Sequence, residues 1–80
     1  MKKELEKFLI ERNYMFDGTV LRTYRRKKKM SQSDVAKALN THQQTISRHE
    51  STDLLPSSEY LIAYSYLYDV SIDEIVFGRR

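Results

Sequence analysis

The stretch "MSQSDVAKALNTHQQTISRHE", residues 30–50, decides the fold because it contains two helical patterns separated by a very short polar break. The first pattern begins at Ser31, whose side chain can cap a helix, and Asp34 three residues later gives a variant of the capping box. Its apolar stripe recurs at helical spacing and consists of Val35, Ala36 and Leu39. These features predict a helix that begins directly after Ser31.

The polar break lies at Asn40 and Thr41. Asparagine is one of the few residues other than glycine that tolerates the left-handed backbone conformation in which many helices end. Thr41 can cap a second helix at once, because its hydroxyl accepts a hydrogen bond from an N–H group of the first turn. Two helices joined by about three residues, with no room for a strand, predict a helix-turn-helix motif.

The second helix has one polar face and one face that can pack. On a helix that begins at His42, the polar residues Gln43, Gln44, Ser47 and Arg48 lie opposite Thr45, Ile46 and His49. Glutamine can bind adenine N6 and N7 in a two-point contact, and arginine can bind guanine O6 and N7 in the same way. Each good pair would discriminate against the wrong base by roughly 1–3 kcal/mol. The polar face is therefore suited to reading base edges.

The rest of the chain is also helical in pattern, so an all-α fold is expected. Helices are predicted at residues 2–13, at about 18–28 with Asp17 as its N-cap, from Ser57 or Ser58 to about Tyr68, and from Ser71 to Gly78. The third of these would bury Leu61, Tyr64, Ser65 and Tyr68 on its inner face. We expect one domain over residues 1–80, with a helical extension at 1–16 and the helix-turn-helix domain at 17–78.

Composition limits the classes of protein that this chain can belong to. Eighty residues form one domain near the lower end of what folds on its own core. The chain has no cysteine, which excludes disulfides and thiolate metal sites and is consistent with a reducing compartment. The sequence contains no run of about 18 apolar residues, the length needed to span a bilayer. The start "MKKELEKFLIERN" is too charged for a signal peptide. We expect a cytoplasmic protein with no membrane contact.

The net charge of +3 is unevenly distributed along the chain. Residues 1–30 carry ten Lys or Arg and four Asp or Glu, whereas residues 51–80 carry two and five. This asymmetry suggests one face that meets an anion and another that faces solvent or a partner. The run "RRKKK", 25–29, has a second explanation, because positive charge at a helix end offsets the helix dipole by about 0.3–1 kcal/mol per residue.

Several motifs, taken in order, resemble the phage-repressor helix-turn-helix family, the Cro/cI-like or xenobiotic-response-element type. They are "LR..R" at Leu21, Arg22 and Arg25, "MSQSDVAKAL" at 30–39, "QQTIS..E" at 43–50, Pro56, and "DVSIDEI" at 69–75. Their order and spacing carry the match over residues 20–77. The resemblance implies a lambda-repressor-like domain of five helices, with the recognition helix at 43–50. The helix predicted at 2–13 lies outside it, as an additional N-terminal helix.

The resemblance also implies roles for individual residues. It implies base contacts in the major groove from His42, Gln43, Gln44 and Arg48, to which the polar face of the helix adds Ser47. Contacts to DNA phosphates are expected from Gln32, Thr41, Thr45, Ser51, Lys27, Lys28 and Lys29. Arg25 and Glu50 match a pair that commonly forms an ion pair between the first helix of the family domain and the recognition helix.

The chain departs from the family pattern in three places. The loop "STDLLPS", 51–57, is usually basic and contains glycine, but here it carries Asp53. Phosphate contacts from this loop are therefore expected only through backbone N–H groups and the hydroxyls of Ser51 and Thr52. Asn40 stands where glycine is frequent. His49 stands where a larger apolar residue is usual, so the packing there is expected to be weaker or sensitive to pH.

Other chemistries fit the sequence less well. His42 and His49 lie near no cysteine or converging acidic set, so no metal is expected. No Ser-His-Asp arrangement, carboxylate dyad or phosphate-binding glycine loop is present, so we expect neither an enzyme nor a cofactor. The tyrosines at 60, 64, 66 and 68 could stack on bases, but their helical spacing favours a part in the core and a part in a dimer surface.

The expected function is sequence-specific binding of double-stranded DNA by a transcriptional regulator, a repressor from a phage or mobile element. It would act as a homodimer on an inverted-repeat operator. Two dimer surfaces are possible: one formed by Leu5, Phe8 and Leu9, the other by Ile72, Val76 and Phe77. Instead of forming a dimer surface, Leu5, Phe8 and Leu9 could cover the core of their own domain. The alternative is a protein-interaction module on the same scaffold, an antitoxin or antirepressor with a regulatory protein as its partner. RNA is a third option, since a basic cluster does not distinguish nucleic acids.

Overall fold

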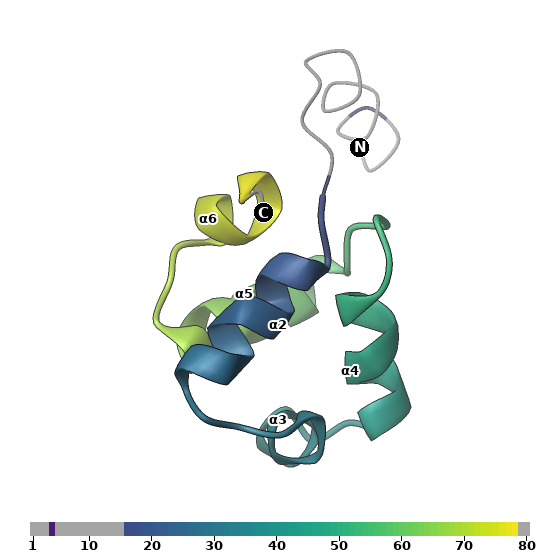
Figure 1. Ribbon diagram of the computed structural model, residues 1–80. Helices are drawn as coiled ribbons and strands as arrows, with labels where there is room; N and C mark the ends of the chain where they lie inside the picture. The colour runs from purple at the N-terminus through teal and green to yellow at the C-terminus, as the bar shows by residue number, and fades with distance from the viewer. Residues whose placement is uncertain (1–3, 5–15, 79–80) are drawn as a thin grey trace.

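The computed structural model describes residue 4 and residues 16–78, and this part of the chain is all-helical (Figure 1). The helices are α2 (Thr19–Lys27), α3 (Gln32–Ala38), α4 (Gln43–Glu50), α5 (Ser58–Tyr68) and α6 (Ile72–Phe77). The all-α prediction is confirmed, whereas the helix predicted at 2–13 lies outside the described residues. Among the residues described, no helix has the length and apolar content required to cross a membrane.

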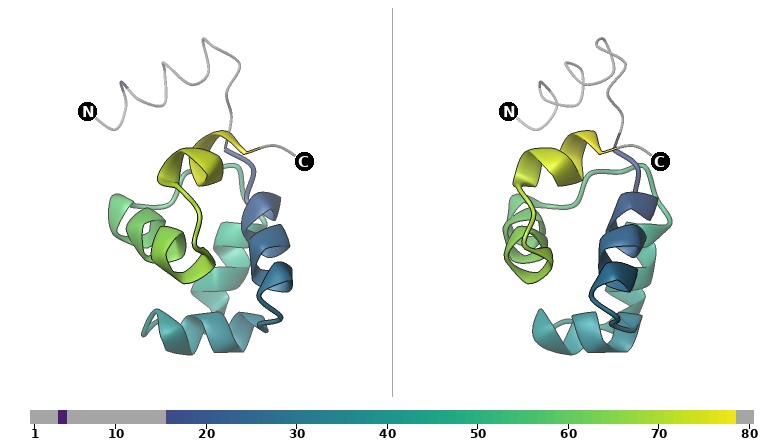
Figure 2. Two further views of the ribbon diagram at one scale, coloured as in Figure 1. Left: turned by 90° about the vertical axis from the view of Figure 1, so that its left-hand side faces the viewer. Right: turned by 60° about the vertical axis from the view of Figure 1, so that its left-hand side comes forward.

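The helices surround one core to which each of them contributes a fully buried side chain. In the right-hand view of Figure 2, α2 and α4 lie together on one side, α5 lies on the other, and α3 crosses the bottom. The core hydrophobic side chains with 0% exposure are, from α2 to α6, Leu21, Val35, Ile46, Tyr64 and Ile75. The helix-turn-helix formed by α3 and α4 is therefore held in place by packing against α2, α5 and α6 in the shared core.

The N-terminal caps agree only in part with the sequence predictions. The Ser31 side chain accepts a hydrogen bond from the Asp34 N–H, and the Asp34 carboxylate accepts one from the Ser31 N–H, which completes the capping box. The Ser71 side chain caps α6 by accepting a hydrogen bond from the Glu74 N–H. Ser57 is the N-cap residue of α5 but makes no side-chain cap bond.

Two predicted caps are wrong. His42, not Thr41, is the N-cap residue of α4, because the Thr41 hydroxyl bonds to the hydroxyl of Tyr60 instead. Gly18, not Asp17, is the N-cap residue of α2, although Asp17 Oδ1 still accepts from the Thr19 N–H at 3.0 Å. In both cases the helix has its N-cap one residue later than predicted.

Three helices end at a residue with a left-handed backbone, and none of these residues is glycine. Lys29, Asn40 and Asp69 have φ values of 57°, 54° and 55°. After Lys29, the Met30 N–H bonds to the Arg25 carbonyl at 3.2 Å, while the Lys29 N–H bonds to the Arg26 carbonyl at 3.0 Å. This pair of bonds is a Schellman motif, which satisfies carbonyls at the helix end and turns the chain sharply.

Candidate nucleic-acid interface

The turn between α3 and α4 orients the second helix. The Thr41 N–H bonds to the Ala36 carbonyl at 2.9 Å and the Asn40 N–H to the Lys37 carbonyl at 3.2 Å, a second Schellman motif. Asn40 supplies the left-handed residue that this motif requires, as its sequence position predicted. The chain reaches the N-terminus of α4 within a few residues, so the angle between the two helices is set locally.

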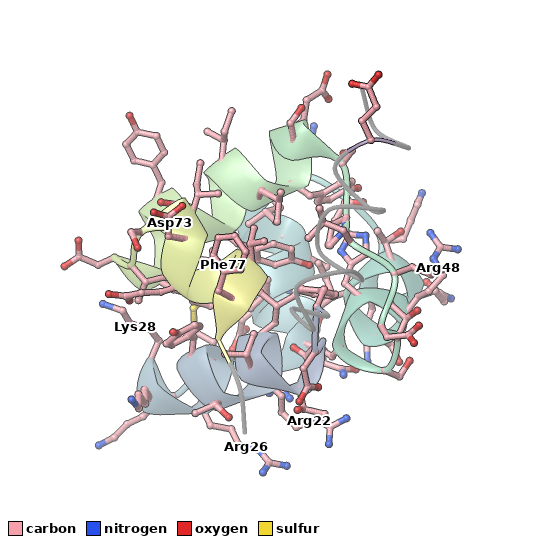
Figure 3. The ribbon with its side chains drawn as sticks, turned by 90° about the horizontal axis from the view of Figure 1, so that it is seen from above. Arg22, Arg26, Lys28, Arg48, Asp73 and Phe77 are labelled. Carbon is pink, nitrogen blue, oxygen red and sulfur yellow. The ribbon has the colours of Figure 1, made fainter. Side chains whose placement is uncertain are left out.

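The polar face of α4 is open and its other face is buried. The exposed side chains are those predicted to read bases: His42, Gln43, Gln44, Ser47 and Arg48. Ile46 has 0% exposure and His49 has 9%, while Thr45 is half-buried. Figure 3 shows Arg48 pointing away from the helices at the edge of the molecule. The structure therefore brings these residues onto one accessible surface.

A buried carboxylate joins α4 to the two helices before it. Glu50 has 0% exposure, and Arg25 donates to it twice, from Nε to Oε2 at 2.7 Å and from Nη2 to Oε1 at 3.1 Å. Gln32 Nε2 donates to the same Oε1 at 3.2 Å. The hydrogen bond to Glu50 raises the pKa of Arg25, which keeps the guanidinium charged. The ion pair implied by the family resemblance is thus present and links α2, α3 and α4.

Three of the residues predicted to bind phosphates use their side chains within the protein. The Gln32 amide bonds to Glu50, and the hydroxyls of Thr41 and Tyr60 lie 2.7 Å apart. The Ser51 hydroxyl donates to the Ser47 carbonyl at 2.9 Å and would have to leave it to donate to a phosphate. For Gln32 the backbone N–H is the better candidate, because the first N–H groups of a helix have no partner within that helix.

The basic run lies at the end of α2, on a different side of the molecule from Arg48 (Figure 3). Lys27, Lys28 and Lys29 are exposed, at the end of α2. In Figure 3, Lys28 and Arg48 project from opposite sides of the molecule, with Arg22 and Arg26 along a third edge. Lys28 and Arg48 therefore belong to different edges of the described part of the molecule (Figure 3).

His49 is held in a ring of aromatic contacts. Its Nδ1 lies 2.7 Å from the Tyr64 hydroxyl, and its ring meets those of Tyr60 and Tyr64 edge-on, with centroids 4.6 and 5.7 Å apart. Burial, and secondarily the charge of Arg48, lowers the pKa of His49 from its ordinary value. The expectation of pH sensitivity at this position is therefore supported by its surroundings.

The parts played by Tyr60 and Tyr64 were not predicted from the sequence. The tyrosines were expected partly in the core, where Tyr64 lies at 0% exposure, and partly in a dimer surface, which stays a prediction; Tyr66 is 86% exposed. Neither expectation indicated that two hydroxyls of α5 would bond to the turn before α4 and to its last turn. The only sequence signal was their spacing of four residues, which places both on one helix face.

An exposed polar helix, fixed by a buried ion pair within a helix-turn-helix, defines a protein that binds DNA. The chain matches the family model described as Helix-turn-helix over residues 21–75. It belongs to the Cro/cI-type helix-turn-helix family, also called the XRE family. This is a family of DNA-binding transcription regulators, and that function applies to this chain. The comparisons with curated proteins and with solved structures give no match.

The family match does not test some of the predictions made from the sequence. It covers residues 21–75, so the division into an extension at 1–16 and a domain at 17–78 stays a prediction. Among the described residues, no group of three or more His, Cys, Asp or Glu is placed to hold a metal ion.

Proposed function

We propose that this protein is a repressor that reads an inverted-repeat operator in the major groove, as a homodimer, in a phage or mobile element. The observation that carries the proposal is the exposed face of α4, on which Gln43, Gln44, Ser47 and Arg48 lie over a buried inner face. Glutamine and arginine are the side chains that make two-point contacts with adenine and guanine. His42, at the N-cap position, would contact a base or phosphate at the helix end.

Phosphate contacts would hold this helix in the groove without reading sequence. The N–H of Gln32, the half-buried hydroxyl of Thr45 and the groups of Thr41 and Ser51 are the proposed partners near α4. Lys27, Lys28 and Lys29 would add attraction at a distance, which is strong at low salt and weak at high salt.

The test is selection from a random duplex DNA pool at two salt concentrations, with two variants that each remove one positive charge. Arg48→Ala is expected to relax preference at particular base positions, by roughly 1–3 kcal/mol of discrimination. Lys28→Ala is expected to weaken binding about equally across sequences and to reduce the salt dependence. Gln43→Ala should relax different positions from those affected by Arg48→Ala.

A different pattern would contradict the proposal. If the wild-type protein enriches no motif and binds in a purely salt-dependent manner, α4 does not read sequence. If Arg48→Ala and Lys28→Ala weaken binding alike, without loss of preference at any position, Arg48 is a phosphate contact rather than a base contact.

A homodimer is proposed because one recognition helix reads too few base pairs for tight specific binding. Half-sites about one helical turn apart, ~34 Å, would then be expected. Of the residues expected at the dimer surface, Ile72 and Phe77 are partly exposed at 39% and 38%, whereas Val76 is buried at 8% and packs in the core. Leu5, Phe8 and Leu9 lie outside the described residues. Analytical ultracentrifugation that finds a monomer both free and on the operator would contradict the dimer.

One observation favours the alternative of a protein-interaction module with weak or autoregulatory DNA binding. On α5, Ile62 is 48% exposed and Tyr66 is 86% exposed, and the charged residues from 51 to 78 are all acidic. An exposed apolar surface on a segment whose charged residues are acidic suits a basic protein partner, such as the target of an antitoxin or antirepressor. Failure of the DNA selection, combined with a monomeric mass, would favour this alternative.

A further inference from the structure

Two side chains of α5 reach α4 at its two ends. The Tyr60 hydroxyl lies 2.7 Å from Thr41 Oγ1, in the turn just before α4. The Tyr64 hydroxyl lies 2.7 Å from Nδ1 of His49, in the last turn of α4. Since the two tyrosines are four residues apart, they lie on one face of α5. A single helix face therefore bonds to both ends of the helix proposed to read DNA.

The contact at the last turn is enclosed by protein. Tyr64 has 0% exposure and His49 has 9%, and the rings of Tyr60 and Tyr64 both meet the imidazole edge-on. Water has little access to this hydrogen bond and cannot readily replace it. A buried polar group that loses its partner is costly, because it has already lost its hydration.

The surroundings of Tyr64 fix the direction of this bond. Burial raises the pKa of the Tyr64 phenol, so the hydroxyl keeps its proton. Nδ1 of His49 is the hydrogen-bond partner that the described residues give to this hydroxyl. Donation from this O–H to a neutral imidazole protonated on Nε2 is the arrangement that gives the buried hydroxyl an acceptor. A second proton on His49 would turn Nδ1 into a donor and leave the buried O–H without an acceptor.

The helices packed on α4 divide its contacts between them. Arg25 of α2 and Gln32 of α3 face Glu50, whereas Tyr60 and Tyr64 of α5 face the imidazole of His49. The charged group that acts on the imidazole is Arg48, on α4 itself. Glu50 is thus anchored by α2 and α3, and the two hydroxyls of α5 provide a separate anchorage.

We propose that the Tyr60 and Tyr64 hydroxyls are positioning groups that set the orientation of the recognition helix and thereby its discrimination between DNA sequences. The inference rests on the proposed function of α4. Apolar packing is non-directional, whereas a hydrogen bond has a preferred distance and angle. Two such bonds at opposite ends oppose both tilting and rotation of α4. A small rotation would move Gln43 and Arg48 away from the base edges that they contact.

The experiment compares Tyr60→Phe and Tyr64→Phe with Tyr66→Phe in the full chain. Tyr66 lies on the same helix but is 86% exposed, so its variant controls for the loss of a hydroxyl. One measurement is the affinity for a duplex enriched by wild-type selection, relative to a scrambled duplex of the same length. Amide hydrogen exchange and an NMR titration of His49 follow the same variants without DNA.

The proposal expects a loss of discrimination rather than of binding. Each of Tyr60→Phe and Tyr64→Phe should lower the affinity ratio by about 2- to 10-fold, the net worth of one hydrogen bond. Affinity for the scrambled duplex should stay within about twofold of wild type. The pKa of His49 should stay lowered in both variants, because its causes, burial and the charge of Arg48, remain. Tyr66→Phe should change none of these quantities.

Two results would overturn the inference. One is an affinity ratio within twofold of wild type in both variants; the other is an equal fall in affinity for the enriched and scrambled duplexes. A wild-type protein that enriches no duplex would refute the proposed function instead. Hydrogen exchange then decides on the anchorage: faster exchange confined to α4 supports it, and faster exchange spread over all the described helices refutes it.

Discussion

The carboxylate of Glu50 accepts hydrogen bonds from Arg25 and Gln32 while it is fully buried. A buried charge is tolerated only when it is paired and its lone pairs are satisfied, because removing it from water costs several kcal/mol. Arg25 meets this requirement with two bonds from a planar fork and also donates to the Met30 carbonyl. The ion pair is therefore a point at which a single substitution should have a large effect.

Arg25→Met should lower the free energy of unfolding by up to about 3–5 kcal/mol, since it leaves the buried Glu50 charge with Arg22, whose Nε lies 3.7 Å from Oε1, as its cationic partner. Urea denaturation at pH 7 measures this change. Arg26→Met is the matched control, because Arg26 is the exposed neighbour in the same helix end. Its loss should cost less than about 1 kcal/mol, the worth of its interaction with the helix dipole. Equal effects of the two substitutions would show that the ion pair contributes little.

His49 should make stability depend on pH in mildly acidic solution. Its pKa is lowered in the folded protein, so folding favours the neutral ring. The corresponding stability is fully present above the ordinary pKa of 6.5 and is lost as pH falls from there toward the lowered folded value. The free energy of unfolding should therefore fall over this interval, as urea denaturation from pH 8 to pH 5 would measure.

Two histidine variants test whether His49 is the source of this pH dependence. His49→Leu should flatten the profile below pH 6.5, at a cost of about 1–3 kcal/mol at pH 8 because Tyr64 loses its acceptor. His42→Ala, at an exposed position, should leave the slope as in wild type. A slope that persists in His49→Leu would assign the dependence to other groups.

At the level of single elements, the sequence predicted those features that depend on neighbouring residues. The capping box of Ser31 and Asp34 and the left-handed Asn40 are encoded within a few positions of where they act. The Thr41 cap failed for the opposite reason. Its hydroxyl bonds to Tyr60, which lies 19 positions along the chain, and no local pattern announces this competition.

The three helix ends that use left-handed residues give a prediction for α2. Lys29 has a φ of 57°, where a side chain costs about 1 kcal/mol or more relative to glycine. Lys29→Gly should therefore raise the free energy of unfolding by about 0.5–1 kcal/mol. Lys28→Gly removes the same charge at a residue with φ of −86°, and should lower stability by a similar amount. Two changes of the same sign in urea denaturation would contradict this account.

On the scale of the whole molecule, the helical fold and its family were predictable, but the contacts between distant helices were not. Helical periodicity was sufficient to predict the helical fold, and the order of the motifs was sufficient to predict the family. That Tyr60 and Tyr64 would bond to the two ends of α4 depends on how α5 crosses it, which follows from packing of the complete core. The bond from the Ser51 hydroxyl to the Ser47 carbonyl is different in kind, because it is local and spans four residues at the end of α4.

Gly18 shows how closely the parts of the molecule approach one another. Its N–H bonds to the Thr52 carbonyl at 3.0 Å, and an added Cβ would press against the carbonyl oxygens of His49 and Thr52. The backbone of Gly18, with φ of −58°, would accept alanine without strain. Gly18→Ala should therefore destabilise through this contact alone.

The expected cost of Gly18→Ala is about 1–3 kcal/mol, as for other overpacked sites. Urea denaturation measures it, with Ser58→Ala as a control at an exposed helix start that should change stability by less than about 0.5 kcal/mol. A Gly18→Ala protein as stable as wild type would mean that α2 and the segment after α4 can separate freely.

The exposed face of α4 has a further consequence for how such a protein can change. Within the described part of the chain, Gln43, Gln44 and Arg48 make no side-chain hydrogen bond, whereas the residues behind them are buried and paired. Exchanging them should alter which sequence is read while leaving stability within about 0.5 kcal/mol. A lineage could thus acquire new binding sites by single substitutions, each of which passes through a folded protein.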